Sequence, residues 1–206
     1  MDMKISNLQP RIIIAAVAGL LLLRLIELFI PIPTYAKLYG TLAQKYEQKN
    51  DYPRAIQLYK KALHHNPSYN QTYYELGVLY GKMGDDQQKL AYFQEFVNLG
   101  QDPDKVHLVK KDYRRDVDYA TAAYQLGLDY TQKGEYLKAI NLFEETVKHS
   151  DLFTEAYYEM GINYIKLGNI PKAKEQLQHL KKVNNKPVLT RALEERFKTN
   201  PRVPFR

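Results

Sequence analysis

The chain has 206 residues but no cysteine and no tryptophan. Without cysteine there can be no disulfide, no thiol nucleophile and no zinc site that needs thiolate ligands. The net charge of +7 is moderate and is not gathered into a dedicated basic block. A composition of 45% apolar and 26% charged residues excludes wholesale disorder and suits one or two globular domains. Tyrosine, by contrast, is abundant, with 18 residues.

Motifs for catalysis and metal binding are also missing from the sequence. We find no phosphate-binding P-loop, no dinucleotide fingerprint, no serine nucleophile elbow and no supported pair of catalytic carboxylates. None of the five histidines has the i,i+4 partner or the nearby carboxylates that a metal site needs; they are His64, His65, His107, His149 and His179. We therefore expect no enzyme activity, no metal, no cofactor and no small-molecule substrate.

One apolar run stands out near the start, in residues 12–30, behind a short flank of residues 1–11. As a helix its 19 residues would extend roughly 28 Å, close to the thickness of the bilayer hydrocarbon. A cleavable signal peptide or a buried soluble helix is the alternative. The run is longer than a typical signal-peptide core and is followed by Pro31-Ile32-Pro33, which favours an uncleaved, single-pass transmembrane anchor.

Four residues of this run are candidates for contact with another membrane helix. Arg24 and Glu27 are three positions apart and share a helix face, so they either neutralise each other or meet a polar group of a partner helix. Ala15 and Gly19 form a small-xxx-small pair that would allow close helix approach. Basic residues flank both ends of the run and do not decide its orientation. The short basic start resembles a signal-anchor and gives a preference for a repeat domain on the extracytoplasmic side, periplasmic or lumenal.

The rest of the chain repeats itself. Four turns mark the repeats, with spacings of 34, 50 and 34 residues; they are Asn50-Asp51, Gly84-Asp85, Gly134-Glu135 and Gly168-Asn169. Seven residues before each turn lies a small residue; these are Ala43, Gly77, Gly127 and Gly161. The turn residues predict a left-handed end to the first helix of each pair. The small residues predict close approach of the two helices of one repeat, Gly161 included.

The segments YELGVLYGKMGD, YQLGLDYTQKGEYLKAINLF and YYEMGINYIKLGNIPKA carry this pattern, which resembles the tetratricopeptide repeat (TPR) family over residues 36–185. The resemblance implies an all-α, right-handed superhelical solenoid of four helix pairs. Two repeats would occupy residues 34–103 and two more residues 120–185. Lys89 replaces the small packing residue of the second repeat, and we expect distorted packing there.

Three further segments complete the predicted organisation. Residues 104–119 are an insertion, expected to be helical and to lengthen the first helix of the third repeat. Its outer cations, around Lys110–Arg115, are offset by Asp112, Asp116 and Asp118. Residues 187–199 begin with proline and carry an apolar stripe, which predicts a C-terminal capping helix. Residues 200–206 form an irregular tail.

In the TPR fold the first helix of each pair lines a groove, and counting from the small residues identifies the side chains expected there. Nine of them form the predicted partner-binding groove: Tyr74, Val78, Lys82, Tyr124, Leu128, Gln132, Tyr158, Ile162 and Lys166. Tyrosines and aliphatic residues suit an apolar or aromatic segment better than an acidic tail. The alternative is that the inserted helix or the cap covers this surface.

These observations predict a non-catalytic, membrane-anchored protein-interaction scaffold. It would be a permanent subunit or a transient assembly factor of a membrane complex. Its partners would be proteins, membrane proteins among them, and the lipid bilayer through residues 12–30. The alternative is a soluble or peripheral adaptor that binds anionic lipid or nucleic acid through its basic C-terminal end. Its six cations are scattered and lack clustered aromatic residues, so nucleic acid is disfavoured.

Overall fold

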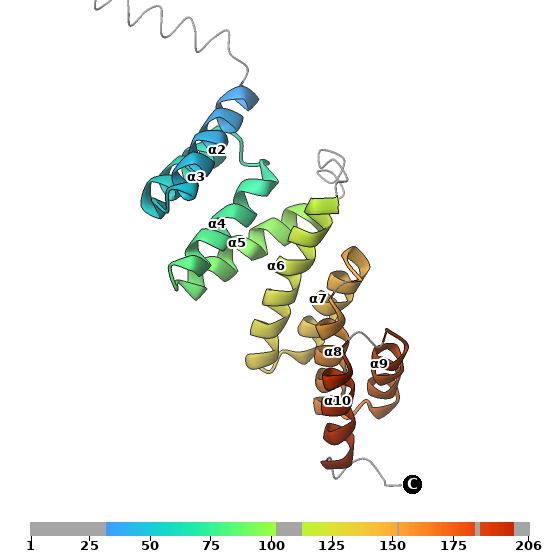
Figure 1. The fold of residues 1–206 in the computed structure, drawn as a ribbon. Helices are drawn as coiled ribbons and strands as arrows, with labels where there is room; N and C mark the ends of the chain where they lie inside the picture. The colour runs from blue at the N-terminus through green and yellow to red at the C-terminus, as the bar shows by residue number, and fades with distance from the viewer. Residues whose placement is uncertain (1–31, 102–112, 152, 184–185, 200–206) are drawn as a thin grey trace, which may run out of the picture. The chain divides into compact units, whose positions relative to one another are not determined.

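The computed structural model describes residues 32–101, 113–151, 153–183 and 186–199. In these ranges the chain forms nine α-helices and no strand (Figure 1). The helices are α2 (Ile32–Gln48), α3 (Tyr52–His65), α4 (Asn70–Lys82), α5 (Asp86–Gln101), α6 (Tyr113–Gln132), α7 (Tyr136–His149), α8 (Thr154–Lys166), α9 (Ile170–Val183) and α10 (Pro187–Thr199). Helices α2 to α9 form TPR-like helix pairs, and α10 follows the last pair.

The chain divides into two compact units, Met1–Tyr69 and Asn70–Arg206, and each is considered by itself. The predicted right-handed superhelix concerns both units together and stays a prediction. The predicted membrane-helix contacts Ala15, Gly19, Arg24 and Glu27 lie outside the described residues. Within the described ranges, no helix combines the length and apolar character needed to cross a bilayer.

Unit 1 contains the helix pair α2 and α3. Asn50 ends the first helix with a left-handed backbone, at φ 59°. The Asp51 carboxylate then caps α3 by accepting a hydrogen bond from the Arg54 backbone N–H at 3.3 Å. Ala43 and Ala55 are fully buried, so their small side chains permit close helix packing, and the Tyr59 ring fills the remaining space.

The turns of unit 2 confirm the left-handed helix ends. Gly84, Gly134 and Gly168 have φ angles of 79°, 77° and 76°, which only glycine adopts at no steric cost. Asp85 and Asn169 follow two of these turns, and each accepts a hydrogen bond from the backbone N–H three residues later. The same local device therefore ends one helix and starts the next.

Two glycines show the predicted close approach within a helix pair. A Cβ added to Gly77 would lie 2.5 Å from the Phe93 ring, and one added to Gly127 would lie 2.6 Å from the Phe143 ring. The expected distortion of the second repeat is not seen at this contact. Instead, the Lys89 methylenes lie against Gly81, 3.0 Å from where its Cβ would be, while the ammonium pairs with Asp86 at 2.5 Å.

Gly161 differs from the other two glycines in its nearest neighbour. A Cβ there would lie 2.7 Å from Leu193 of α10, and the three nearest atoms all belong to that residue, whereas we expect the second helix of its own pair to be nearest. The reason is visible in the sequence, where the position of Phe93 and Phe143 is occupied by the shorter Leu177. Leu193 from the next helix fills the space instead, and it is completely buried.

Helix α10 lies along both α8 and α9 (Figure 1). Leu193 anchors it, and Phe197 packs against the core cluster that contains Phe143 and Met160. An ion pair of 2.7 Å joins Lys181 of α9 to Glu194 of α10. At the other junction, α6 includes residues 113–119 of the inserted segment, whereas residues 104–112 lie outside the described residues.

Candidate partner-binding face

The first helices of the three pairs in unit 2 are neighbours, because α4 contacts α6 and α6 contacts α8. Each contributes one of the predicted tyrosines: Tyr74, Tyr124 and Tyr158. We call the surface of these helices around the three tyrosines the tyrosine face. The tyrosines differ in how firmly the structure holds them.

Tyr74 is the most firmly held. Its ring centroid lies 5.7 Å from that of Phe93 and 5.4 Å from that of Phe96. Its hydroxyl hydrogen-bonds with Asp118 of α6. Burial and the neighbouring Asp118 carboxylate raise the pKa of Tyr74 to about 12, because both disfavour the phenolate.

Tyr124 also rests on the core. Its ring centroid lies 5.6 Å from that of Phe143 and 5.7 Å from that of Phe153. Burial, together with the charges of Glu159 and Glu155, raises the pKa of Tyr124 to about 12. Aromatic packing of this kind stabilises the fold, so Tyr74 and Tyr124 serve the core as well as the surface.

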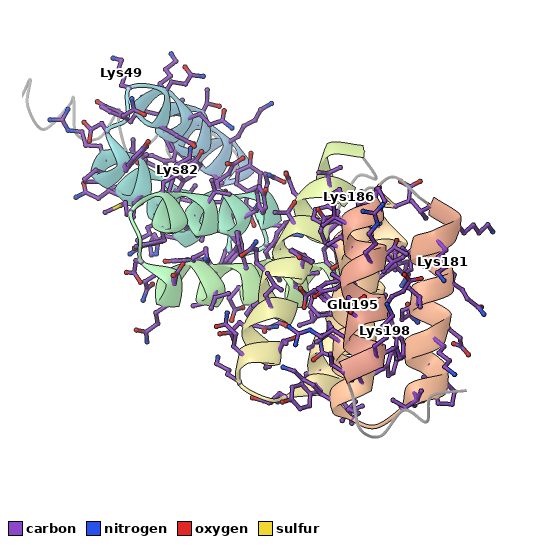
Figure 2. All side chains as sticks on the ribbon, turned by 60° about the horizontal axis from the view of Figure 1, so that its bottom comes forward. Lys49, Lys82, Lys181, Lys186, Glu195 and Lys198 are labelled. Carbon is purple, nitrogen blue, oxygen red and sulfur yellow. The ribbon has the colours of Figure 1, made fainter. Side chains whose placement is uncertain are left out.

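The other predicted residues of the face differ in how far they are buried. Tyr158 and Ile162 of α8 are half-buried. Val78 packs against the cluster around Phe96, and Leu128 against the cluster around Phe143. The remaining three are exposed and lie at or near the ends of their helices: Lys82, Gln132 and Lys166 (Lys82 is labelled in Figure 2). Lys166 places its ammonium 5.0 Å from the centroid of the Tyr136 ring.

The sequence prediction missed the acidic groups of this face. Asp118, which we expect to offset cations on an outer surface, is only 8% exposed. It accepts a hydrogen bond of 2.8 Å from the Gln71 side chain and so links α6 to α4. Glu155 forms an ion pair with Lys186 at the start of α10 (Figure 2).

Glu159 is the acidic group with the most unusual setting. Its side chain is half-buried one residue after Tyr158, and burial raises its pKa, an effect that the charge of Lys166 partly opposes. Among the described residues no ion pair involves its carboxylate. The repeat offered a signal for this group, since Glu75, Gln125 and Glu159 each directly follow the tyrosine of their repeat.

A buried polar contact fixes α6 against α8 beside the face. Asn163 is completely buried, and its side-chain amide donates to the Thr131 hydroxyl at 2.9 Å and to the Glu159 backbone carbonyl at 2.8 Å. A buried amide with its partners in place rigidifies the helices that hold it. The backbone that presents Glu159 is therefore held in place from within.

Two open hollows lie outside the tyrosine face. One, of about 520 Å³, is lined mainly by the ends of α5, α6 and α7. In it His149 approaches Asp116 at 3.1 Å and lies with its ring centroid 4.3 Å from that of Tyr119. Asp116, like Asp118, therefore links helices, and does not merely offset neighbouring charges. The second hollow, of about 400 Å³, lies between α5 and α6 around Leu90, Leu126 and Tyr130.

The C-terminal cations are partly engaged within the protein. Lys186 pairs with Glu155, and Lys198 pairs with Glu195 at 2.7 Å (Figure 2). Arg191 and Arg196 are exposed, whereas Arg202 and Arg206 lie outside the described residues. Two of the four described cations thus have acidic partners, which weakens the alternative of a free basic surface for lipid or nucleic acid.

In the described part of the chain, no group of three histidine or carboxylate side chains could hold a metal ion.

Comparison with known families identifies the repeated units. A family model described as TPR repeat matches residues 43–84, and one described as tetratricopeptide repeat matches residues 71–99 and 155–183. These segments are tetratricopeptide repeats. Such TPR units generally mediate protein–protein interactions and are generally not catalytic.

One solved structure supports the TPR-like fold at a TM-score above 0.5, and two others are similar at lower scores. A chain of the Cut9–Hcn1 hetero-tetramer of the APC/C is 17% identical; the match covers 78% of this chain and 29% of that chain, at a TM-score of 0.51. The MamA protein is 26% identical over 74% of this chain and 94% of its own, at a TM-score of 0.41. YrrB, a TPR protein with an unusual peptide-binding site, is 17% identical over 76% and 90%, with a TM-score of 0.41. No curated protein matches the chain.

Proposed function

We propose that this protein is a non-catalytic scaffold anchored in a membrane, where it holds partner proteins as a subunit or assembly factor of a membrane complex. Residues 12–30 supply the anchor, and the TPR domain lies on the extracytoplasmic side. The tyrosine face is the docking surface. Anchoring raises the effective concentration of the domain at the bilayer, so modest contacts suffice for capture.

The observation that supports this proposal most is the setting of Glu159. A carboxylate that is half-buried and outside any described ion pair is costly, as its raised pKa reflects. It lies beside the aromatic surface of Tyr158, in a repeat of a kind that generally binds proteins. A partner segment that places a lysine or arginine on Glu159 and an apolar side chain on Tyr158 would relieve this cost and bury aromatic surface.

The test is partner capture by the full chain, tagged and extracted in mild detergent from the membranes in which it is made. Two variants remove the proposed contacts: Glu159→Gln, which keeps the shape but not the charge, and Tyr158→Ala. Gln178→Ala on the exposed surface of α9 is the matched control. We expect a defined set of membrane proteins to co-purify with the wild type and the control. Both face variants should lose that set, while their circular dichroism and melting temperature stay close to wild type.

The same co-purifying set on all four proteins would contradict the tyrosine face as the docking surface. The hollow around His149 and the inserted segment would then be the next surfaces to test. If no membrane protein co-purifies with any of the four, the scaffold proposal itself fails.

A further inference from the structure

The exposed surface of α2 has an unusual mixture of side chains. Leu38 is 60% exposed and Leu42 is 39% exposed. Lys37, Thr41 and Lys45 are exposed on the same side of the helix, since the five positions i, i+1, i+4, i+5 and i+8 fall within an arc of about 140°. We call these five residues the outer face of α2.

Packing of unit 1 leaves this face without acidic groups. Ala36 and Ala43, on the opposite side of α2, are buried. The one acidic residue of α2 is Glu47, whose carboxylate accepts a hydrogen bond from the Tyr59 hydroxyl of α3 at 3.4 Å, so it is turned toward the helix pair. The outer face therefore combines two leucines and two lysines with no counter-charge of its own.

The charge balance of the whole pair points the same way. Between residues 35 and 69 there are six cations and two acidic residues; the cations are Lys37, Lys45, Lys49, Arg54, Lys60 and Lys61. One of the acids, Asp51, is already paired with Arg54 at 3.3 Å. Lys49, just past the end of α2, extends away from the ribbon (Figure 2). A basic helix surface with exposed leucines is the pattern that binds the interface of anionic membranes.

The position of α2 in the chain, directly after the apolar run, indicates that the bilayer is what contacts its outer face. The apolar run ends at Ile30, two residues before α2 begins, and Leu38 is eight residues beyond that end. Eight residues span at most roughly 27 Å when extended and about 12 Å as a helix, so Leu38 cannot be far from the bilayer surface if the run spans the bilayer. Pro31 and Pro33 disfavour one straight helix through this junction, which allows α2 to turn along the surface.

We infer that the outer face of α2 lies on the membrane, with Leu38 and Leu42 among the acyl chains near the headgroups and Lys37 and Lys45 on anionic lipid headgroups. This inference rests on the proposed anchor. It adds that the first repeat is a membrane-contacting element, which leaves the tyrosine face of unit 2 for protein partners.

The chain lacks cysteine, so a single introduced thiol can be labelled with an environment-sensitive fluorophore. The full-length protein carries the label at Thr41→Cys in the outer face and is reconstituted into lipid nanodiscs. The discs contain phosphatidylcholine alone or phosphatidylcholine with phosphatidylglycerol. Gln57→Cys on the exposed side of α3 is the control within unit 1, and Gln178→Cys on α9 is the control in unit 2.

We expect the Thr41 label to shift to shorter emission wavelengths and to be quenched by spin-labelled lipid severalfold more than either control. The effect should be larger with phosphatidylglycerol and weaker in high salt, since exposed charges are screened. Lys37→Gln with Lys45→Gln should reduce it in anionic discs. Leu38→Ser with Leu42→Ser should reduce it in both kinds of disc.

The failures are distinguishable. If the protein stays with the discs but all three labels respond alike, the inference is wrong and the anchor stands. If the protein does not stay with the discs, the anchor fails, and the inference with it. If the Thr41 label is equally shielded in detergent and the protein is a dimer by light scattering, a second copy covers the face and the inference is overturned.

Discussion

The third helix pair, α6 and α7, and the fourth, α8 and α9, differ in which residue packs against the glycine of the first helix. In both, a glycine of the first helix leaves a space that a large side chain must fill. In the third pair the filler is Phe143, from the second helix of the same pair. In the fourth pair it is Leu193, which belongs to α10 and lies 32 positions after Gly161 in the chain.

The difference shows what ends the array. A helix pair that carries phenylalanine at this position completes its own core, whereas the fourth pair, with Leu177 there, depends on the helix that follows it. Helix α10 therefore both covers the last repeat and supplies a side chain to its core. Repeat arrays are stabilised by contacts between neighbours, so damage at these two sites should spread differently.

The largest loss of stability is expected in the third pair, α6 and α7, whose core is filled by its own Phe143. Phe143→Ala removes a completely buried ring that contacts Gly127 and Tyr124. Loss of such an aromatic side chain typically costs about 3–5 kcal/mol. Thermal and urea unfolding of the variant should show this loss. A loss below about 1 kcal/mol would mean that the cavity collapses and the ring is not central to the core.

Leu193→Ala tests the contact between α10 and Gly161 of α8. Burial of this leucine is complete, so we expect a loss of about 2–5 kcal/mol in the free energy of unfolding. Hydrogen exchange should accelerate in α8, α9 and α10, the helices that pack together, and change little in α4 and α5. Uniform acceleration across unit 2 would show that the last pair does not depend on α10 in particular.

Gly161→Leu probes the same contact from the other side. A side chain here would meet Leu193 at 2.7 Å and overpack the contact, at a cost of roughly 1–3 kcal/mol. A double-mutant cycle sharpens the result: Gly161→Ala should be destabilising alone but much less so in the Leu193→Ala background, where space is available. Equal effects of Gly161→Ala in both backgrounds would exclude direct coupling of the two residues.

The smallest effect concerns alkaline pH. The pKa values of Tyr74, Tyr119 and Tyr124 are each raised from 10.0 to about 12, with burial as the first cause. Their contribution to stability is therefore complete below about pH 10 and is lost as the pH rises toward 12, because only the unfolded chain ionises readily in that window. Tyrosinate absorbance should show a late-titrating fraction that Tyr124→Phe diminishes. Titration of all tyrosines together near pH 10 in the folded protein would contradict the burial.

The turns and the close helix contacts were predictable because their signals are local. A glycine at a fixed position before an aspartate or asparagine identifies a left-handed helix end, and Gly77 and Gly127 recur in register with Phe93 and Phe143. The all-helical repeat fold follows from those patterns.

The missed features all depend on which helices meet. Leu193 belongs to the stripe that predicts a capping helix, yet nothing in that stripe indicates that its partner is Gly161. Asp118 lies in a segment of mixed charge that looks like a solvated surface, and its hydrogen bond to Gln71 joins residues 47 positions apart. Glu159 was readable as a neighbour of the tyrosine column, but its burial depends on how α8 packs.

The proposed scaffold depends on residues 12–30 as its membrane anchor. Fractionation of membranes from cells that express the full chain, followed by alkaline carbonate extraction, tests this anchor. We predict that the full-length protein stays in the membrane pellet after extraction. A form without residues 1–33 should move to the supernatant and keep its helical circular dichroism spectrum. Full-length protein found intact in the soluble fraction would show that residues 12–30 do not anchor it.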